Sequence, residues 1–255
     1  MTFPPRPQST QLANGDCVVA WLRPELVHGS RAIQECERIL CSDELVRYRR
    51  FLRPADRHRF LVAHTLKRIW LSKFLQTPAD RLRFEIDQFG KPSLLGDHHR
   101  RLAFNLSHTT GLVACAIADA GTVGIDVEDC SRAINIEIGK TVYSESEMNA
   151  MRALEECEQR NRFFQLWTYK EAYSKARGLG FQLPMKQCEF HFPPEQSVQP
   201  KFGADVHDDP SRWRFVSRLI EPNHRCAVAV PIERESPGRV DFYEFSERDL
   251  RAEPE

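Results

Sequence analysis

The sequence predicts an α+β protein built from two similar halves. Segments typical of strands, then of helices, then of strands again follow one another along the chain, and this order occurs twice. Single strands alternating with single helices would instead favour a wound parallel sheet. The chain has 255 residues, of which 41% are hydrophobic and 28% charged, so it can bury a sizeable core. We find no clear repeat between the halves, so their similarity rests on element order alone.

The first half is predicted to begin with a strand and to continue with three helices. CVVAWL, residues 17–22, has the apolar run of a strand. Residues 30–40 form a short predicted helix, and residues 42–52 form another after a Ser-Asp-Glu start signal. Residues 54–75 place apolar side chains at helical spacing and give the clearest helix.

Three strands are predicted in the middle of the chain. LAFNLSHT, residues 102–109, ends in polar side chains, and LVACAIA, residues 112–118, is typical of a buried strand. TVGIDVED, residues 122–129, follows after the short turn ADAG. Because a short turn joins them, we expect the last two strands to form a hairpin.

The second half repeats helices and then strands. Residues 144–156 and 161–177 fit helices, and the second helix is expected to end at Gly178 and Gly180. Three later segments alternate like strands: 188–192, 213–220 and 226–232. We therefore divide the chain into an N-terminal half, 14–118, and a C-terminal half, 119–235. Residues 1–13 and 236–255 are expected to be loose tails.

The overall composition excludes several classes of function. Lys plus Arg and Asp plus Glu are equal at 36 each, so the charge of the whole chain says nothing about partners. We expect no nucleic-acid partner. We expect no membrane span and no leader, because no apolar run is long enough. The eight cysteines contain no Cys-x-x-Cys pair, which favours reduced core thiols in the cytoplasm over zinc ligands. His98 and His99 lack an evident third ligand and are interpreted as loop histidines.

Charge is unevenly distributed along this neutral chain. From Arg47 to Lys73 nine basic residues accompany one acid, Asp56, whereas nine acids accompany three bases from Asp126 to Glu158. A basic and an acidic segment together suit a polyanionic ligand that is held partly through a cation. The alternative is that both segments are ordinary solvated helix faces.

Asp126 and Glu128 form the first candidate site. Side chains alternate across a strand, so these two carboxylates share one face, where their charges repel. A divalent cation between them would relieve the repulsion, and Mg²⁺ prefers such oxygen ligands. The alternative is a solvated strand face.

Glu171 lies on the apolar side of the helix predicted over 161–177. It continues a stripe with Phe164 and Trp167, with Lys175 one turn further and Lys170 beside it. A carboxylate on an inner face is costly unless it is paired or bound to metal. The alternative is a surface pair of Glu171 with Lys175.

Two further stretches could contact an anion. Ser107 and His108 end a strand and point to opposite sides, so they suit hydrogen bonds to a phosphate better than a nucleophile–base couple. Lys91 lies in the turn Gly90-Lys91-Pro92 and could offer its ammonium to an anion. The alternatives are a local turn cap and an ordinary turn.

The order of four motifs resembles the Sfp-type branch of the 4′-phosphopantetheinyl transferases. The motifs are GKP (90–92), FNLSH (104–108), GIDVE (124–128) and FFQLWTYKEAYSKARGLGF (163–181). The resemblance runs from about Arg57 to Pro184, and GIDVE followed by W-x-x-K-E-x-x-x-K is its most specific part. It implies two similar α/β halves related by a pseudo-twofold axis, with coenzyme A in the cleft between them.

The resemblance also implies an activity and a set of site residues. Such enzymes transfer the phosphopantetheine arm of coenzyme A to a serine of an apo carrier protein of acyl, peptidyl or aryl type. Mg²⁺ on the pyrophosphate would be bound by Asp126, Glu128 and Glu171. The 3′-phosphate would be held by Ser107 and His108 with help from Arg59 and Lys91, while Lys175 would lie against the phosphates and Lys170 would support the site.

A mechanism follows as a hypothesis. Glu171, directly or through a metal-bound water, would take the proton from the carrier serine, and Lys175 would steady the departing 3′,5′-ADP. Two points stay open: Arg53 or Arg57 could replace Arg59 at the 3′-phosphate, and Glu128 could reach the metal through water. The length resembles that of the monomeric enzymes, so we expect a monomer.

Two other functions fit part of the pattern. Another magnesium enzyme, such as a nucleotide-diphosphate hydrolase, explains the carboxylates and basic helix but not the order of the motifs. A non-catalytic module that docks carrier domains is the second alternative. The presence of all three carboxylates and Lys175 argues against a decayed site.

Overall fold

The computed structural model describes residues 12–96, 102–193, 197–232 and 238–250. The predictions for 1–11, for 251–255 and for His98 and His99 lie outside these residues. Within the described part, no helix is long and apolar enough to cross a membrane. All eight cysteines are free thiols.

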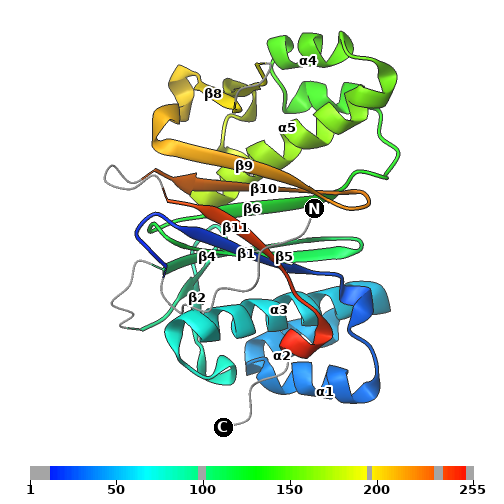
Figure 1. Ribbon diagram of the computed structural model, residues 1–255, viewed down its shortest axis with the longest axis vertical. Coiled ribbons are helices and arrows are strands. Elements are labelled where there is room, and N and C mark those ends of the chain that lie inside the picture. Colours follow the sequence, from blue (N-terminus) through cyan, green and yellow to red (C-terminus); the bar gives the residue numbers. More distant parts are fainter. Residues whose placement is uncertain (1–11, 97–101, 194–196, 233–237, 251–255) are drawn as a thin grey trace.

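Two β-sheets pack face to face, and helices cover the outer face of each (Figure 1). The first sheet has the order β11-β1-β5-β4, with β1 (Cys17–Leu22), β4 (Leu102–Thr109), β5 (Leu112–Asp119) and β11 (Val240–Glu244). The second has the order β6-β10-β9, with β6 (Gly124–Asp129), β9 (Trp213–Ile220) and β10 (His224–Pro231). The predicted α+β architecture is therefore observed.

Within the described residues, five α-helices and two small hairpins complete the fold. The helices are α1 (Ser30–Ile39), α2 (Ser42–Arg50), α3 (Pro54–Leu75), α4 (Glu145–Arg152) and α5 (Glu156–Arg177). The hairpins pair β2 (Phe84–Ile86) with β3 (Pro92–Leu94), and β7 (Cys188–His191) with β8 (Gln199–Phe202). As predicted, α5 ends at Gly178, which adopts a left-handed conformation that glycine tolerates.

The continuous apolar run of β5 is explained by burial on both faces. Val113, Cys115 and Ile117 pack in the core under α3, whereas Ala114 and Ala116 pack in the core between the two sheets. The small alanine side chains let the second sheet approach closely. A strand that is buried on both faces carries apolar side chains at every position, so its sequence does not alternate between apolar and polar residues.

The predicted hairpin between residues 112–118 and 122–129 is wrong. β5 pairs with β1 on one side and β4 on the other, so it has no free edge for β6. After a turn at Gly121, with φ of 72°, the chain instead enters the second sheet, where β6 pairs with β10. Two buried strands joined by a short turn can pair within one sheet or lie in two different sheets. The length of the turn alone does not distinguish the two arrangements.

The prediction of a loose tail from residue 236 is also wrong for residues 238–250, the part of it that the structure describes. β11 pairs in parallel with β1, and Phe242 and Phe245 are buried. The last described residues therefore complete the sheet of the first half. The division into 14–118 and 119–235 leaves out this strand, which packs with the N-terminal half.

Gly124 allows β6 to lie directly against α5. A Cβ atom there would overlap the carbonyl oxygen of Ala172 and would lie 2.5 Å from the backbone nitrogen of Ala176. Backbone atoms of a packed helix cannot shift as a flexible side chain can. The glycine of the GIDVE motif thus sets the distance between the strand that carries Asp126 and the helix that carries Glu171.

Replacement of Gly124 by alanine should force β6 and α5 apart. We expect Gly124→Ala to lower the free energy of unfolding by roughly 1–3 kcal/mol, measured by urea denaturation. Gly203→Ala is the matched control, because its Cβ would meet only the side chain of Gln187 and should cost less. Equal losses for the two variants would contradict this account.

A buried ionic cluster fastens α2 to α3. Glu44 accepts hydrogen bonds from Lys67 at 2.7 Å, from Arg68 at 2.6 Å and from His64 at 2.9 Å. Burial opposes ionisation of Glu44, but the His64 hydrogen bond and the Lys67 charge hold its pKa well below its usual range. Burial lowers the pKa of His64 from 6.5 to about 4, so this imidazole is neutral in the folded protein near neutral pH.

Acid should destabilise the protein through His64. Its pKa is lower in the folded state, so the unfolded chain binds the proton more readily and stability is lost as pH falls from 6.5 towards 4. At about 1.4 kcal/mol per pH unit, the loss from this group is about 3 kcal/mol. The lowered pKa of Glu44 also makes the free energy of unfolding decrease as the pH falls, but at lower pH values. Unfolding measured between pH 7 and 4 should show a smaller change for His64→Gln; an unchanged profile would contradict the assignment.

Candidate active site

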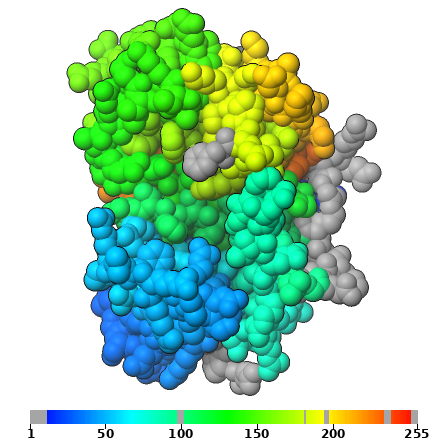
Figure 2. Space-filling model, turned by 180° about the vertical axis from the view of Figure 1, so that it is seen from behind, coloured from blue at the N-terminus to red at the C-terminus, as the bar shows by residue number. Residues whose placement is uncertain are grey.

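One strand and one helix bring the three predicted metal ligands to a single pocket. Asp126 and Glu128 project from one face of β6, and Glu171 projects from α5. The pocket has a volume of about 680 Å³, within the range of small-molecule sites. The rest of its wall comprises Thr141, Val142, Trp167, Leu183, Pro184, Met185, Lys186 and Gln187. Figure 2 shows the surface hollowed between the two halves of the molecule.

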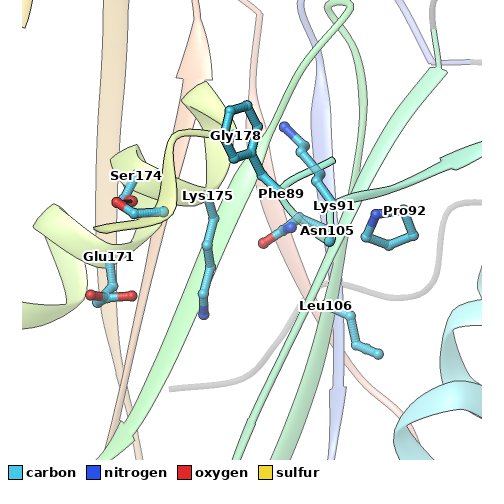
Figure 3. Close-up of a pocket in the computed structure, with 11 residues that line it drawn as sticks. Phe89, Lys91, Pro92, Asn105, Leu106, Glu171, Ser174, Lys175 and Gly178 are labelled. Carbon is cyan, nitrogen blue, oxygen red and sulfur yellow. Dashed lines mark hydrogen bonds between the residues drawn. The ribbon is translucent and has the colours of Figure 1, made fainter. Parts of the chain in front are cut away.

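A second pocket of about 320 Å³ shares Glu171 with the first. Figure 3 shows Glu171 and Lys175 projecting from α5, with Lys91 and Asn105 on the other side of this pocket. Phe89, from the turn between β2 and β3, adds an aromatic ring. The two pockets, which share Glu171, together offer carboxylates, ammonium groups and apolar surface.

In the part of the chain that the structure describes, Asp126 forms hydrogen bonds through only one of its two carboxylate oxygens. Its Oδ1 accepts a hydrogen bond from Lys175 Nζ at 2.6 Å and another from Ser107 Oγ at 3.1 Å. Its Oδ2 is buried and has no hydrogen-bond partner among the described residues. A buried carboxylate oxygen without a partner is costly, so this atom is a candidate ligand atom.

Burial raises the pKa of all three carboxyl groups, and a neighbouring like charge adds to the shift for two of them. Burial raises the pKa of Asp126, although Lys175 and Ser107 favour its ionised form. Burial and then the charge of Asp126 raise the pKa of Glu128 to about 7 and that of Glu171 above its ordinary range. Glu128 is partly compensated by Arg132, whose Nη2 lies 2.8 Å from Glu128 Oε2.

The donor set fits a hard divalent cation. Among the described residues, no three His, Cys, Asp or Glu side chains stand in the arrangement of a formed metal site. Asp126 and Glu128 instead pair with Lys175 and Arg132 respectively. All three groups are nevertheless oxygen donors of the kind that Mg²⁺ prefers, and Asp126 Oδ2 is free to bind. A cation would also relieve the repulsion from Asp126 that, after burial, raises the pKa values of Glu128 and Glu171.

Asn105 and Ser107 join the edge strands of the two sheets. Asn105 Oδ1 accepts from the Ile125 N–H at 3.0 Å, and Ser107 Oγ accepts from the Val127 N–H at 3.2 Å. β4 thereby contacts β6 through side chains in place of a backbone ladder. The sequence analysis did not assign Asn105 a role; its i, i+2 spacing with Ser107 was the available signal.

His108 points to the opposite side of β4 from Ser107, and Arg59, which pairs with Asp56, is near enough for its charge to act on His108. The side chain of His108 is exposed to solvent. Its pKa is nevertheless lowered, first by partial loss of hydration and then by the charges of Arg59 and Lys175. Arg57 instead donates to the Phe51 carbonyl oxygen at 3.1 Å, and Arg53 is the exposed residue that precedes α3. Of the three arginines, Arg59 is therefore the one whose charge acts on His108.

Lys91, predicted to contact an anion, forms hydrogen bonds within the protein. Lys91 Nζ donates to Ala176 O at 2.8 Å and to Thr122 Oγ1 at 2.9 Å, and burial lowers its pKa to about 8. Lys91 thus ties its turn to the end of α5 while its side chain lines the second pocket.

Lys170 does not reach either pocket. Its ammonium is buried, pairs with Glu147 at 2.8 Å, and donates to the carbonyl oxygens of Met185 and Cys188. All three of its donors are therefore used. Because Met185 lines the first pocket, Lys170 supports the wall of the site and is not available to bind a phosphate.

Comparison with known proteins places these residues in a family. Residues 122–229 match the family model described as the 4′-phosphopantetheinyl transferase superfamily, and residues 29–119 match that of the 4′-phosphopantetheinyl transferase N-terminal domain. The chain is 31% identical to the 4′-phosphopantetheinyl transferase HetI of Nostoc sp., over 90% of this chain and 93% of the relative. It is also 31% identical to the 4′-phosphopantetheinyl transferase Sfp of Bacillus subtilis, over 71% of this chain and 77% of that protein.

A vertebrate relative is more distant. The L-aminoadipate-semialdehyde dehydrogenase-phosphopantetheinyl transferase of Xenopus laevis is 26% identical over 84% of this chain and 77% of its own. The two family models cover the N-terminal and C-terminal halves in turn, and the nearly full-length match to the Nostoc protein spans both. The chain belongs to the 4′-phosphopantetheinyl transferase superfamily.

Proposed function

We propose that this enzyme transfers the 4′-phosphopantetheine arm of coenzyme A to a serine of an apo carrier protein in a reaction that depends on Mg²⁺. Membership of the superfamily supports the transferase activity and coenzyme A as its substrate. One observation supports the metal: three carboxylates from β6 and α5 line one pocket, where Asp126 Oδ2 is buried without a partner in the described chain.

Asp126, Glu128 and Glu171 would hold the ion on the diphosphate of coenzyme A. When bound there, Mg²⁺ supplies positive charge that neutralises the phosphate oxygens. Gly124 fixes the distance between the strand and the helix that carry these ligands. Arg132 holds Glu128 in the same pocket, which keeps its carboxylate oriented.

Glu171 is the proposed general base. The serine oxygen bonds to the phosphorus that carries the pantetheine arm, and the bond from that phosphorus to the bridging oxygen breaks to release 3′,5′-ADP. The serine proton passes to Glu171, whose carboxylate lines the pocket proposed for the diphosphate. Lys175, one turn further along α5, lies beside Asp126 and would oppose the negative charge on the departing group.

The remaining parts of coenzyme A are assigned by charge and location. His108 and Arg59 would meet the 3′-phosphate, because both are cationic or hydrogen-bonding groups on one side of β4. Lys91 and Phe89 line the second pocket, where the nucleotide would contact them. The carrier protein would approach the open side of the first pocket beside Glu171.

We infer that the enzyme acts as a cytoplasmic monomer. Every residue in the proposed mechanism comes from one chain, so a single copy contains a full site. The eight free cysteines suit a reducing compartment.

Glu171→Gln should remove the base and preserve the shape of the site. We expect turnover to fall about a hundredfold or more, with coenzyme A binding largely retained. Transfer is measured by mass spectrometry of an apo carrier protein, and binding by calorimetry. Glu158→Gln, an exposed change on the same helix, is the control and should act like wild type. Near-wild-type transfer by Glu171→Gln would refute the assignment.

Chelation of Mg²⁺ should stop the transfer, and added Mg²⁺ should restore it. The assay offers coenzyme A with several apo carriers and records which of them gain the arm. A parallel sample without carrier measures 3′,5′-ADP release. Rapid magnesium-dependent release without any carrier would identify a hydrolase instead, and transfer that persists in chelator would refute the metal.

A further inference from the structure

The hydroxyl of Ser107 is fully used inside the protein. Ser107 Oγ donates to Asp126 Oδ1 at 3.1 Å, accepts from the Val127 N–H at 3.2 Å and accepts from Lys175 Nζ at 3.0 Å. A serine hydroxyl has one donor and two acceptor sites, so these three contacts fill it. Its side chain is buried, and it lines neither of the two pockets.

The three partners of Ser107 belong to the catalytic centre. Asp126 is a proposed metal ligand, Lys175 is the proposed cation for the leaving group, and the Val127 N–H belongs to the strand between Asp126 and Glu128. Ser107 itself comes from β4, in the sheet of the first half. A residue of one half therefore fixes the reacting groups of the other.

This contact also decides which oxygen of Asp126 is left for a ligand. Oδ1 is held by Ser107 and Lys175, so Oδ2 is the atom without a partner in the described chain. Without the Ser107 hydrogen bonds, rotation of the carboxylate and of Lys175 would no longer be restricted from the β4 side.

We propose that Ser107 is a positioning residue that orients Asp126 and Lys175 across the junction of the two sheets, and that it does not bind the 3′-phosphate of coenzyme A. The inference rests on the proposed function. It assigns phosphate contact to the neighbour His108, whose ring is exposed on the other side of β4 beside Arg59.

The roles of Ser107 and His108 are distinguished with two phosphopantetheine substrates. One is coenzyme A, and the other is 3′-dephospho-coenzyme A, which lacks the 3′-phosphate. We expect Ser107→Ala to lower kcat about ten- to a hundredfold with both substrates, leaving the ratio of their KM values as in wild type. His108→Ala should raise KM for coenzyme A and change KM for the dephospho substrate little. A Ser107→Ala effect confined to coenzyme A would overturn the proposal.

A second readout is independent of turnover. Calorimetric titration of Mg²⁺ in the absence of coenzyme A should show about ten- to a hundredfold weaker binding to Ser107→Ala than to wild type. Ser107→Thr, which keeps the hydroxyl and suits a strand, should restore both binding and kcat. Unchanged Mg²⁺ affinity in Ser107→Ala would overturn the proposal.

The controls keep this test separate from the proposed function. If wild type transfers no arm to any carrier, the proposed function fails. The proposal for Ser107 fails if wild type is active and the Ser107→Ala effect is confined to coenzyme A, or if Ser107→Ala leaves the Mg²⁺ affinity unchanged. If Ser107→Ala does not fold, Ser107→Cys takes its place, because a thiol of similar size is a weak donor and acceptor. Its expected results are the same as those for the alanine variant.

Discussion

Three carboxylates held close together in one pocket repel one another, and the surrounding structure is arranged around that cost. Lys175 and Arg132 balance two of them, and Ser107 adds a hydrogen bond to Asp126. Burial, and then the remaining repulsion from Asp126, raise the pKa of Glu128 and Glu171. A site of this kind is preorganised for a divalent cation, because binding relieves strain that folding has already stored.

Two structural devices keep the carboxylates in place. Gly124 permits backbone contact between β6 and α5, which brings Glu171 over the strand. Asn105 and Ser107 then fasten β6 to β4, so the centre is tied to the sheet of the first half as well. The return of the chain through β11 to that same sheet joins the two halves a second time. The position of the site thus depends on both halves.

Local sequence patterns predicted most elements, because periodicity and end signals act within a segment. The bounds of β1, α3 and β9 agree with the predicted ranges, and the common pocket of Asp126 and Glu171 followed from motif order. Pairing between distant segments was not visible: β5 lacked a free edge for β6, and β11 was too short and polar to stand out. The roles of Ser107 and Lys170 depend on partners that only the folded chain supplies.

The central claim is that Asp126, Glu128 and Glu171 bind one divalent ion on the diphosphate of coenzyme A. Crystals grown with coenzyme A and Mn²⁺ in place of Mg²⁺ test it most directly through the anomalous signal of manganese. The account predicts one manganese ion among these three carboxylates, with direct metal–oxygen distances of about 2.0–2.2 Å, and in contact with the diphosphate. An ion bound elsewhere, or a diphosphate bound away from β6 and α5, would contradict it.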